Sequence, residues 1–133
     1  MLKKRFLTRT KGLDKLVTAV KKAAKRGYLK GITGRRLNVR SSHAALNVLL
    51  QSCGAYVMKY YLVELNERLK ENSLDYKFVG NIHDEVQIEI RECDAEFGAR
   101  LAEEAFITTT NILNFKCKLE GEAKLGDSWA DTH

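Results

Sequence analysis

The sequence predicts an α+β fold in which long helices pack on a small antiparallel sheet. Residues 12–26 carry apolar side chains at helical spacing, and residues 41–71 contain an almost continuously apolar run that is typical of a buried helix. Two further stretches, residues 76–82 and 85–91, alternate apolar and polar side chains, which is the pattern of half-buried strands. Only a short polar turn separates these alternating stretches, so we expect them to pair antiparallel.

The first 40 residues are expected to form a helix followed by a hairpin. The helical stripe consists of Leu13, Leu16, Val17, Val20 and Ala24. It ends at Gly27, and glycine commonly terminates helices. Two short strand-like runs then flank the sequence GITG, which indicates a tight turn between paired strands.

This N-terminal third is strongly basic. Residues 1–40 contain 14 Lys and Arg and one acid, whereas residues 41–133 contain 9 basic and 16 acidic residues, so the two segments carry +13 and −7. Lys and Arg displace counterions from phosphates, so this asymmetry favours contact with nucleic acid. The alternative is a solvated helix face. The interspersed apolar residues predict a segment that folds with one packed face and one basic face.

A long helix should follow. Ser41 or Ser42 can cap it, and it should extend to about residue 71. From Ala44 to Val63 the helix is apolar almost all round, which is typical of a buried helix.

A stripe of hydrogen-bonding residues interrupts this apolar pattern. His43, Asn47 and Gln51 follow one another at four-residue spacing and so share one face. Asn and Gln carry both donors and acceptors, so they can contact the minor-groove acceptors that every base pair presents at equivalent positions. Such contact is independent of base sequence. The alternative is that these side chains bind the backbone of a neighbouring loop inside the protein.

The turn between the two predicted strands is unusual in composition. Turns of this kind normally contain Gly, Asn or Pro, whereas this one consists of His83, Asp84 and Glu85. The expected apolar faces are Tyr76, Phe78 and Ile82 on the first strand, and Val86, Ile88 and Ile90 on the second. The residue types at the turn indicate chemistry rather than ease of bending.

The C-terminal third is expected to add a helix and a strand. Asp94 can cap a helix that extends to about residue 113. Residues 115–126, FKCKLEGEAKLG, have the pattern of a further strand.

Composition narrows the class of protein. With 133 residues and 44% hydrophobic content, the chain suits one globular domain or part of one. Cys53, Cys93 and Cys117 are widely spaced and odd in number, which argues against a disulfide framework or a zinc ribbon and favours a cytoplasmic protein. No apolar run approaches the roughly 18 residues of a membrane span, so we expect no membrane contact.

Two motifs in this order resemble the C-terminal region of family A DNA polymerases, particularly those of bacteriophages. They are RSSHAALNVLLQSCGA, residues 40–55, and a strand–HDE–strand stretch, followed by the C-terminal GDSWADTH. The resemblance spans nearly the whole chain. It implies one partial domain over residues 1–133, with a basic helix and hairpin over 1–40 and a palm-like helix and sheet over 41–133.

The resemblance implies that the turn is motif C of a polymerase palm. Asp84 would be one of the two aspartates that hold the catalytic Mg²⁺ ions, Glu85 would support them, and His83 would lie against the primer terminus. A two-metal site needs carboxylates that are held rigidly, and a strand–turn–strand provides this.

The resemblance also implies a role for the polar stripe. His43, Asn47 and Gln51 would contact the minor groove of primer-template DNA. Bacterial members typically place Arg at the first of these positions, where this chain has His43.

Two parts of a polymerase site are absent from the 133 residues. The family has a second metal-binding aspartate in a segment like DYSxIExR, and a fingers helix whose Arg and Lys grip the deoxynucleoside triphosphate upstream of a YG pair. Neither segment occurs here. We therefore expect a chain that is inactive alone. It would be the downstream half of a split DNA-directed DNA polymerase that needs an upstream polymerase chain, or a truncated or excised fragment.

Two other functions are compatible with parts of the pattern. The chain could be a nucleic-acid-binding module without catalysis. It could also be an HD-type metal phosphohydrolase, because His43, His83, Asp84 and Asp131 occur in the order that such enzymes use. Those enzymes, however, carry the His-Asp pair on helices of an all-α fold, whereas here it lies between two predicted strands.

Overall fold

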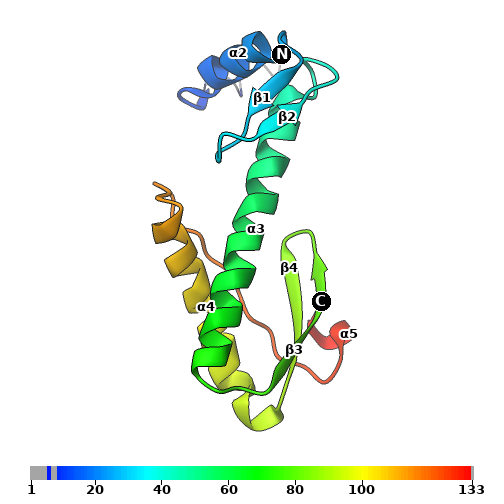
Figure 1. Ribbon diagram of the computed structural model, residues 1–133, viewed down its shortest axis with the longest axis vertical. Helices are drawn as coiled ribbons and strands as arrows, with labels where there is room; N and C mark the ends of the chain where they lie inside the picture. The colour runs from blue at the N-terminus through cyan, green and yellow to red at the C-terminus, as the bar shows by residue number, and fades with distance from the viewer. Residues whose placement is uncertain (1–5, 7–8, 133) are drawn as a thin grey trace. The chain divides into compact units, whose positions relative to one another are not determined.

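A computed structural model describes residue 6 and residues 9–132 of the chain (Figure 1). The fold is α+β, as predicted, with helices and two separate two-stranded antiparallel sheets. The chain forms two compact units, residues 1–54 and residues 55–133. Lys3, Lys4 and Arg5, which contribute to the predicted basic segment, lie outside the described residues, as does His133.

The first unit contains α2 (Leu13–Ala24), β1 (Tyr28–Lys30), β2 (Arg36–Asn38) and the first turns of α3 (Ala45–Glu71) (Figure 1). The predicted helix and hairpin are confirmed. Gly27 ends the helix with a φ of 79°, a conformation that glycine adopts without a Cβ clash. The strands pair antiparallel around the GITG turn, in which Gly31 N–H donates to the Arg35 carbonyl at 2.8 Å.

The core of the first unit collects apolar side chains from all of these elements. They are Val20, Ala24, Leu29, Val39 and Ala45. Val20 and Ala24 belong to the predicted stripe of α2, whereas Leu16 of the same stripe is 43% exposed. The stripe therefore packs along part of its width only.

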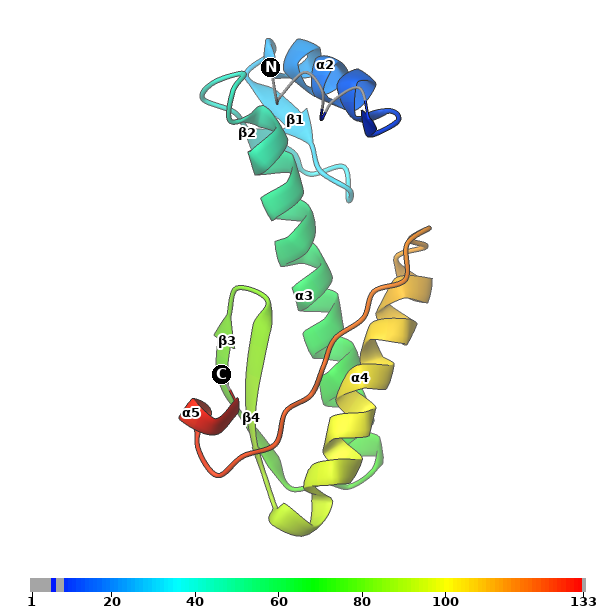
Figure 2. The ribbon, with the colours of Figure 1, turned by 180° about the vertical axis from the view of Figure 1, so that it is seen from behind.

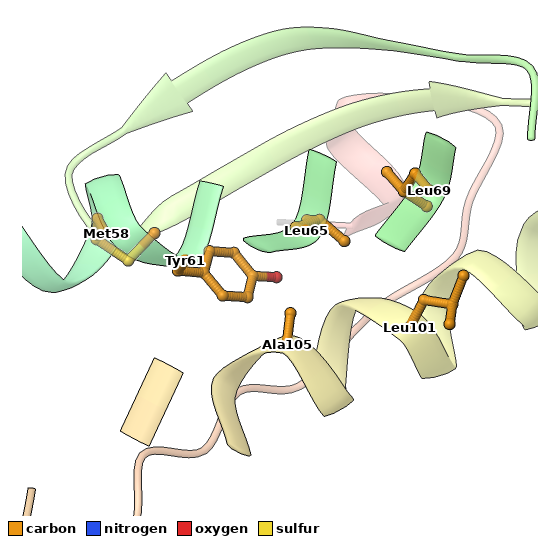
Figure 3. Close-up of a cluster of buried hydrophobic side chains, with 6 residues drawn as sticks. All are labelled: Met58, Tyr61, Leu65, Leu69, Leu101 and Ala105. Carbon is orange, nitrogen blue, oxygen red and sulfur yellow. The ribbon is translucent and has the colours of Figure 1, made fainter. Parts of the chain in front are cut away.

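The second unit is built from the rest of α3, the strands β3 (Tyr76–Ile82) and β4 (Glu85–Ile90), and helix α4 (Ala95–Ile112). Its core joins residues of α3 and α4 at three- and four-residue spacing (Figure 3). These residues are Met58, Tyr61, Leu65, Leu69, Leu101 and Ala105. Leu65 and Leu69 are 0% and 1% exposed, and burial of such side chains contributes about 1.5–3 kcal/mol each.

A polar cluster fixes α3 against α4 beside this core. The Arg68 guanidinium donates to Glu64 on its own helix at 2.8 Å. It also reaches Glu104 at 3.3 Å and the Thr108 hydroxyl at 2.5 Å, both on α4. Three acceptors around one planar guanidinium favour a single pairing of the two helices.

The expectation that α3 is buried all round from Ala44 to Val63 is wrong. Leu50 is 57% exposed in the first unit, and Val63 is 58% exposed in the second. Each unit buries one stripe of the helix, so the remaining apolar residues face outward. The helix also begins at Ala45 rather than at Ser41 or Ser42, although the Ser41 hydroxyl accepts the Ala44 N–H at 3.3 Å in the preceding turn.

The β3–β4 hairpin has the predicted ends but not the predicted apolar face throughout. A register shift between Phe78 and Gly80 inserts Val79 as an extra residue in β3. Beyond this bulge the alternation is reversed, so Ile82 pairs with Glu85 on the face opposite Tyr76 and Phe78. Placing Ile82 with Tyr76 and Phe78 is therefore wrong, because one inserted residue moves every later side chain to the other face.

The two faces of the hairpin have different neighbours. The face that carries Tyr76, Val86 and Ile88 packs on the core of α3 and α4. The opposite face carries Glu85 and Gln87, and α5 (Trp129–Thr132) contacts it.

The C-terminal segment differs from the prediction. Residues 115–126 are extended but form no strand. The Leu119 N–H donates to the Thr110 hydroxyl at 3.0 Å, and the Ala123 N–H donates to the Glu103 carboxylate at 3.2 Å, so side chains of α4 take the place of a strand partner. Figure 2 shows the segment leaving α4 and reaching α5 beside the hairpin.

The predicted start of the preceding helix is nearly correct. A 3₁₀ turn, η1 (Glu92–Asp94), leads into α4, and Asp94 occupies the cap position without a side-chain capping bond. Its carboxylate pairs instead with Arg91 at 3.2 Å. Among the described residues, no helix is both long and apolar enough to cross a membrane.

Candidate functional site

The candidate catalytic residues lie at the tip of the β3–β4 hairpin. Ile82 and Glu85 are the last cross-strand pair, so His83 and Asp84 form a two-residue turn. His83 has a φ of 57°, and positive φ at the first turn residue matches the twist of the flanking strands. The His83 and Asp84 side chains are both exposed.

Glu85 lies in a different environment from Asp84, although the two are adjacent. It is half-buried, and its Oε1 accepts the Trp129 indole N–H at 3.0 Å. The side-chain amide of Gln87 donates to the same oxygen. Two donors on one carboxylate oxygen restrict its orientation.

The helix that supplies Trp129 is itself held locally. The Asp131 carboxylate accepts the Ser128 N–H at 2.9 Å and the Ser128 hydroxyl at 2.6 Å, which is the return half of a capping box. Gly126 is packed so closely that a Cβ would lie 2.5 Å from the Asp131 Cβ. These contacts hold the start of the short α5 against the loop that precedes it.

The turn has the donor type that Mg²⁺ prefers but supplies only part of a site. Mg²⁺ takes about six oxygen ligands, including carboxylates, in near-octahedral geometry. Asp84 offers an exposed carboxylate, and Glu85 lies next to it. Within the described ranges, no group of three or more His, Cys, Asp or Glu side chains is placed to hold a metal ion. Asp84 and Glu85 thus fit Mg²⁺ as part of a site whose other ligands would come from elsewhere.

The residues of the predicted polar stripe lie in the first unit. Asn47 and Gln51 are exposed and one turn apart on α3, so they share a face. His43 is exposed in the turn before the helix, and its predicted placement within the helix is wrong. The exposure of Asn47 and Gln51 does not fit the alternative in which they bind the backbone of a loop inside the protein.

The hairpin of the first unit adds a feature that the sequence reasoning missed. Tyr28 of β1 lies beneath two guanidinium groups, with Arg36 at 4.0 Å and Arg26 at 5.4 Å from its ring centroid. Cation–π contact orients both cations, and although the Arg26 Nε–H donates to the Ala23 carbonyl at 3.4 Å, the terminal N–H groups of both guanidinium groups can donate to anions. The sequence signal for this cluster is an aromatic strand residue with one Arg two positions before it and another Arg beyond the GITG turn.

The structure also overturns one alternative. In an HD-type phosphohydrolase the His-Asp pair is borne on helices of an all-α fold, whereas His83 and Asp84 join two strands in an α+β fold.

Comparison with known proteins gives a consistent result along the sequence. A model of DNA polymerase family A matches residues 1–131. The DNA-directed DNA polymerase of Escherichia phage T7 is 34% identical over 154 aligned positions, which cover 99% of this chain and 22% of that protein. DNA polymerase I of Aquifex aeolicus (strain VF5) is 28% identical, with 97% of this chain and 23% of that protein covered.

The fold also matches a solved polymerase structure. The POL domain of Pol1 from M. smegmatis, in complex with DNA primer-template and dNTP, gives a TM-score of 0.70 over 78% of this chain and 21% of that chain, at 22% identity. The chain spans less than a quarter of the length of these relatives. Because the family model matches nearly every residue, this chain belongs to DNA polymerase family A.

Proposed function

We propose that this chain is the C-terminal part of a DNA-directed DNA polymerase that binds primer-template DNA and supplies the motif C carboxylate, Asp84, for nucleotidyl transfer. One observation carries the proposal. Asp84 is exposed at the tip of a two-residue turn, and behind it Val86 and Ile88 pack on the core while Glu85 on the other face accepts the Trp129 indole N–H. An exposed carboxylate on a rigid support suits a metal ligand.

The three residues of the turn would have different roles. Asp84 would hold Mg²⁺, with Glu85 beside it as support and His83 near the primer terminus. Bound Mg²⁺ lowers the pKa of the primer 3′-hydroxyl and offsets charge on the triphosphate. The chain's own contribution is to fix the position of the Asp84 carboxylate, which the tight turn does by pairing Ile82 with Glu85 directly behind it.

The first unit would bind the primer-template duplex. Asn47 and Gln51 present amide groups on one exposed face of α3, with His43 in the turn before it. The Arg26–Tyr28–Arg36 cluster offers two oriented guanidinium groups for phosphates. Amide contacts to minor-groove acceptors and guanidinium contacts to phosphates are both independent of base sequence.

The remainder of a polymerase would complete the site. This chain supplies one carboxylate pair, and the second metal-binding aspartate and the nucleotide-binding helix would come from an upstream polymerase chain. An apolar groove of about 490 Å³ between α3 and β3 supports contact with such a chain, because the exposed side chains of Val63, Phe78 and Val79 line it. The deoxynucleoside triphosphate would bind only in the complete assembly.

Primer extension by reconstituted polymerase tests this function. The purified chain alone should extend no primer, and addition of the upstream part of a phage family A polymerase should restore extension. In that assembly, Asp84→Asn should reduce extension by at least about 10³-fold while leaving duplex affinity nearly unchanged, because removal of a metal-binding charge costs several kcal/mol of transition-state stabilisation.

A matched control separates this effect from a general loss of negative charge. Glu89→Gln removes a carboxylate from the same strand, where Glu89 is exposed and pairs with Lys77 at 3.7 Å. It should leave extension unchanged. Extension by the chain alone, or full activity of the assembly that carries Asp84→Asn, would contradict the proposal. Duplex binding without any reconstituted extension would favour the non-catalytic binding module.

A further inference from the structure

The contact between α5 and the hairpin joins two segments that are far apart along the chain. Trp129 donates its indole N–H to Glu85 Oε1 at 3.0 Å, and Thr132 donates its hydroxyl to Gln87 Oε1 at 3.4 Å. Gln87 in turn donates to Glu85. These three hydrogen bonds link α5 to Glu85, the residue that directly follows Asp84 in the sequence. Figures 1 and 2 both place α5 beside the hairpin.

Trp129 is held in place from both sides. The capping box of Ser128 and Asp131 fixes the start of α5. The preceding extended segment is anchored on α4 through Leu119 and Ala123. Trp129 is nevertheless 53% exposed, so its position is not that of a core residue. A partly solvent-exposed aromatic side chain whose N–H donates to a polar group is suited to orienting that group.

We propose that Trp129 is a positioning residue for motif C. Its indole N–H, together with the Gln87 amide, fixes the rotation of the Glu85 carboxylate and thereby holds the turn that carries Asp84. This role rests on the proposed function of Asp84 as a metal ligand. The C-terminal segment would then support the metal site as well as pack on α4.

The physical reason lies in the freedom of a glutamate side chain. The last torsion of Glu is broad and roughly two-fold, so an unrestrained carboxylate next to a metal site samples many orientations. Two N–H donors on Oε1 restrict this torsion before a metal binds. Loss of such supporting partners typically lowers metal affinity about 10- to 100-fold.

Trp129 is the only tryptophan in the chain, so one indole N–H resonance reports its contact directly. In a ¹H–¹⁵N spectrum of the full chain, Glu85→Ala should move this resonance upfield and accelerate its exchange with water, because a charged acceptor is lost. Glu89→Ala is the matched control on the same strand and the same face, and it should leave the resonance in place. The backbone resonances of each variant show whether the fold is retained.

A second measurement tests the effect on metal binding. In the assembly reconstituted with the upstream part of a phage family A polymerase, Mn²⁺ affinity, measured by electron paramagnetic resonance of free Mn²⁺, should fall about tenfold in Trp129→Phe. It should be unchanged in Leu125→Ala, which alters an exposed apolar residue of the same C-terminal segment. Asp84→Asn should remove the specific binding altogether.

The outcomes separate this inference from the proposed function. An indole resonance that is insensitive to Glu85→Ala would overturn the contact. Full Mn²⁺ affinity in Trp129→Phe, with binding lost in Asp84→Asn, would overturn the positioning role and leave Asp84 as a ligand. Equal Mn²⁺ binding by the assemblies that carry the wild-type chain and Asp84→Asn would overturn the metal role of the turn, and with it the proposed function, while the resonance would still decide the contact.

Discussion

Tyr61 shows how one residue of the core responds to its surroundings. Its ring stacks on Phe106 with centroids 4.0 Å apart, and the side chain is 5% exposed. Burial, and then the nearby negative charge of Glu103, raise the pKa of Tyr61 from 10.0 to about 12. The neutral phenol is therefore favoured in the folded chain.

This shift predicts a loss of stability in alkali. Below pH 10 the folded and unfolded chains both keep the Tyr61 proton, so the stabilisation is complete. Between pH 10 and about 12 the unfolded chain loses the proton first, so the free energy of unfolding should fall by about 2–3 kcal/mol. Urea unfolding across this range measures the fall, and Tyr61→Phe should make it shallower by that amount. Equal slopes in the two proteins would mean that the phenol ionises as readily folded as unfolded.

At the residue scale, the sequence located the turn but not its support. His83, Asp84 and Glu85 stood out because they interrupt two alternating stretches, and the structure places them at that turn. The Trp129–Glu85 hydrogen bond joins residues 44 positions apart, and no local pattern specifies such a contact. The exposure of Asn47 and Gln51 could not be decided either, since the same spacing suits a buried and an exposed stripe.

At the scale of elements, the C-terminal segment is held by side chains instead of a strand ladder. Gly121 packs against the Phe106 ring so tightly that a Cβ would lie 2.1 Å from its Cε2. Phe106 cannot simply turn away, because it stacks on Tyr61. Glycine at this position therefore allows the segment to approach α4.

Gly121→Ala should consequently destabilise the second unit. The added methyl group must displace either the segment or the stacked ring pair, and overpacking of this kind typically costs about 1–3 kcal/mol. Denaturant unfolding measures the loss. Gly54→Ala is the control, because Gly54 lies in α3 with no atom within 4 Å of its ideal Cβ, and alanine there should be neutral or stabilising by up to about 1 kcal/mol. If both variants unfold at the same denaturant concentration, the tight packing at Gly121 is not present in solution.

Helices and hairpins were predictable because their periods are local. The 3.6-residue pattern predicted α2, and the two-residue pattern predicted β3 and β4. The bulge at Val79 leaves no periodic mark, so Ile82 was assigned to the wrong face. Residues 115–126 alternate as a strand would, yet alternation predicts an extended backbone and not the presence of a partner strand.

At the scale of the whole chain, each unit buries its own core, yet apolar side chains remain exposed in both. Leu50 and Val63 of α3 and Val79 of β3 are all more than half exposed. Exposed apolar side chains of this kind often mark contact surfaces, and the proposed upstream polymerase chain would cover them. The sequence motifs predicted part of a polymerase, but the apolar pattern of α3 could not show which of its side chains are exposed.

The uneven distribution of charge leads to a prediction about DNA binding. Fourteen basic residues lie within residues 1–40, against one acid. If about six of them neutralise phosphates, the logarithm of duplex affinity should fall with the logarithm of salt concentration at a slope of about −5, with little dependence on base sequence. Fluorescence anisotropy with two unrelated duplexes at several salt concentrations measures both quantities.

Two exposed residues of the first unit should affect this binding in different ways. Arg36→Ala removes a guanidinium that lies over Tyr28, so it should make the salt slope less steep by about one. Gln51→Ala removes a neutral amide that releases no counterions, so it should weaken binding while the slope stays the same. Each variant is the control for the other, because both residues are exposed and lie in the same unit. Salt-insensitive binding would contradict the role of the basic segment. A change of slope in Gln51→Ala would show that the amide acts through the phosphate contacts and not through the base edges.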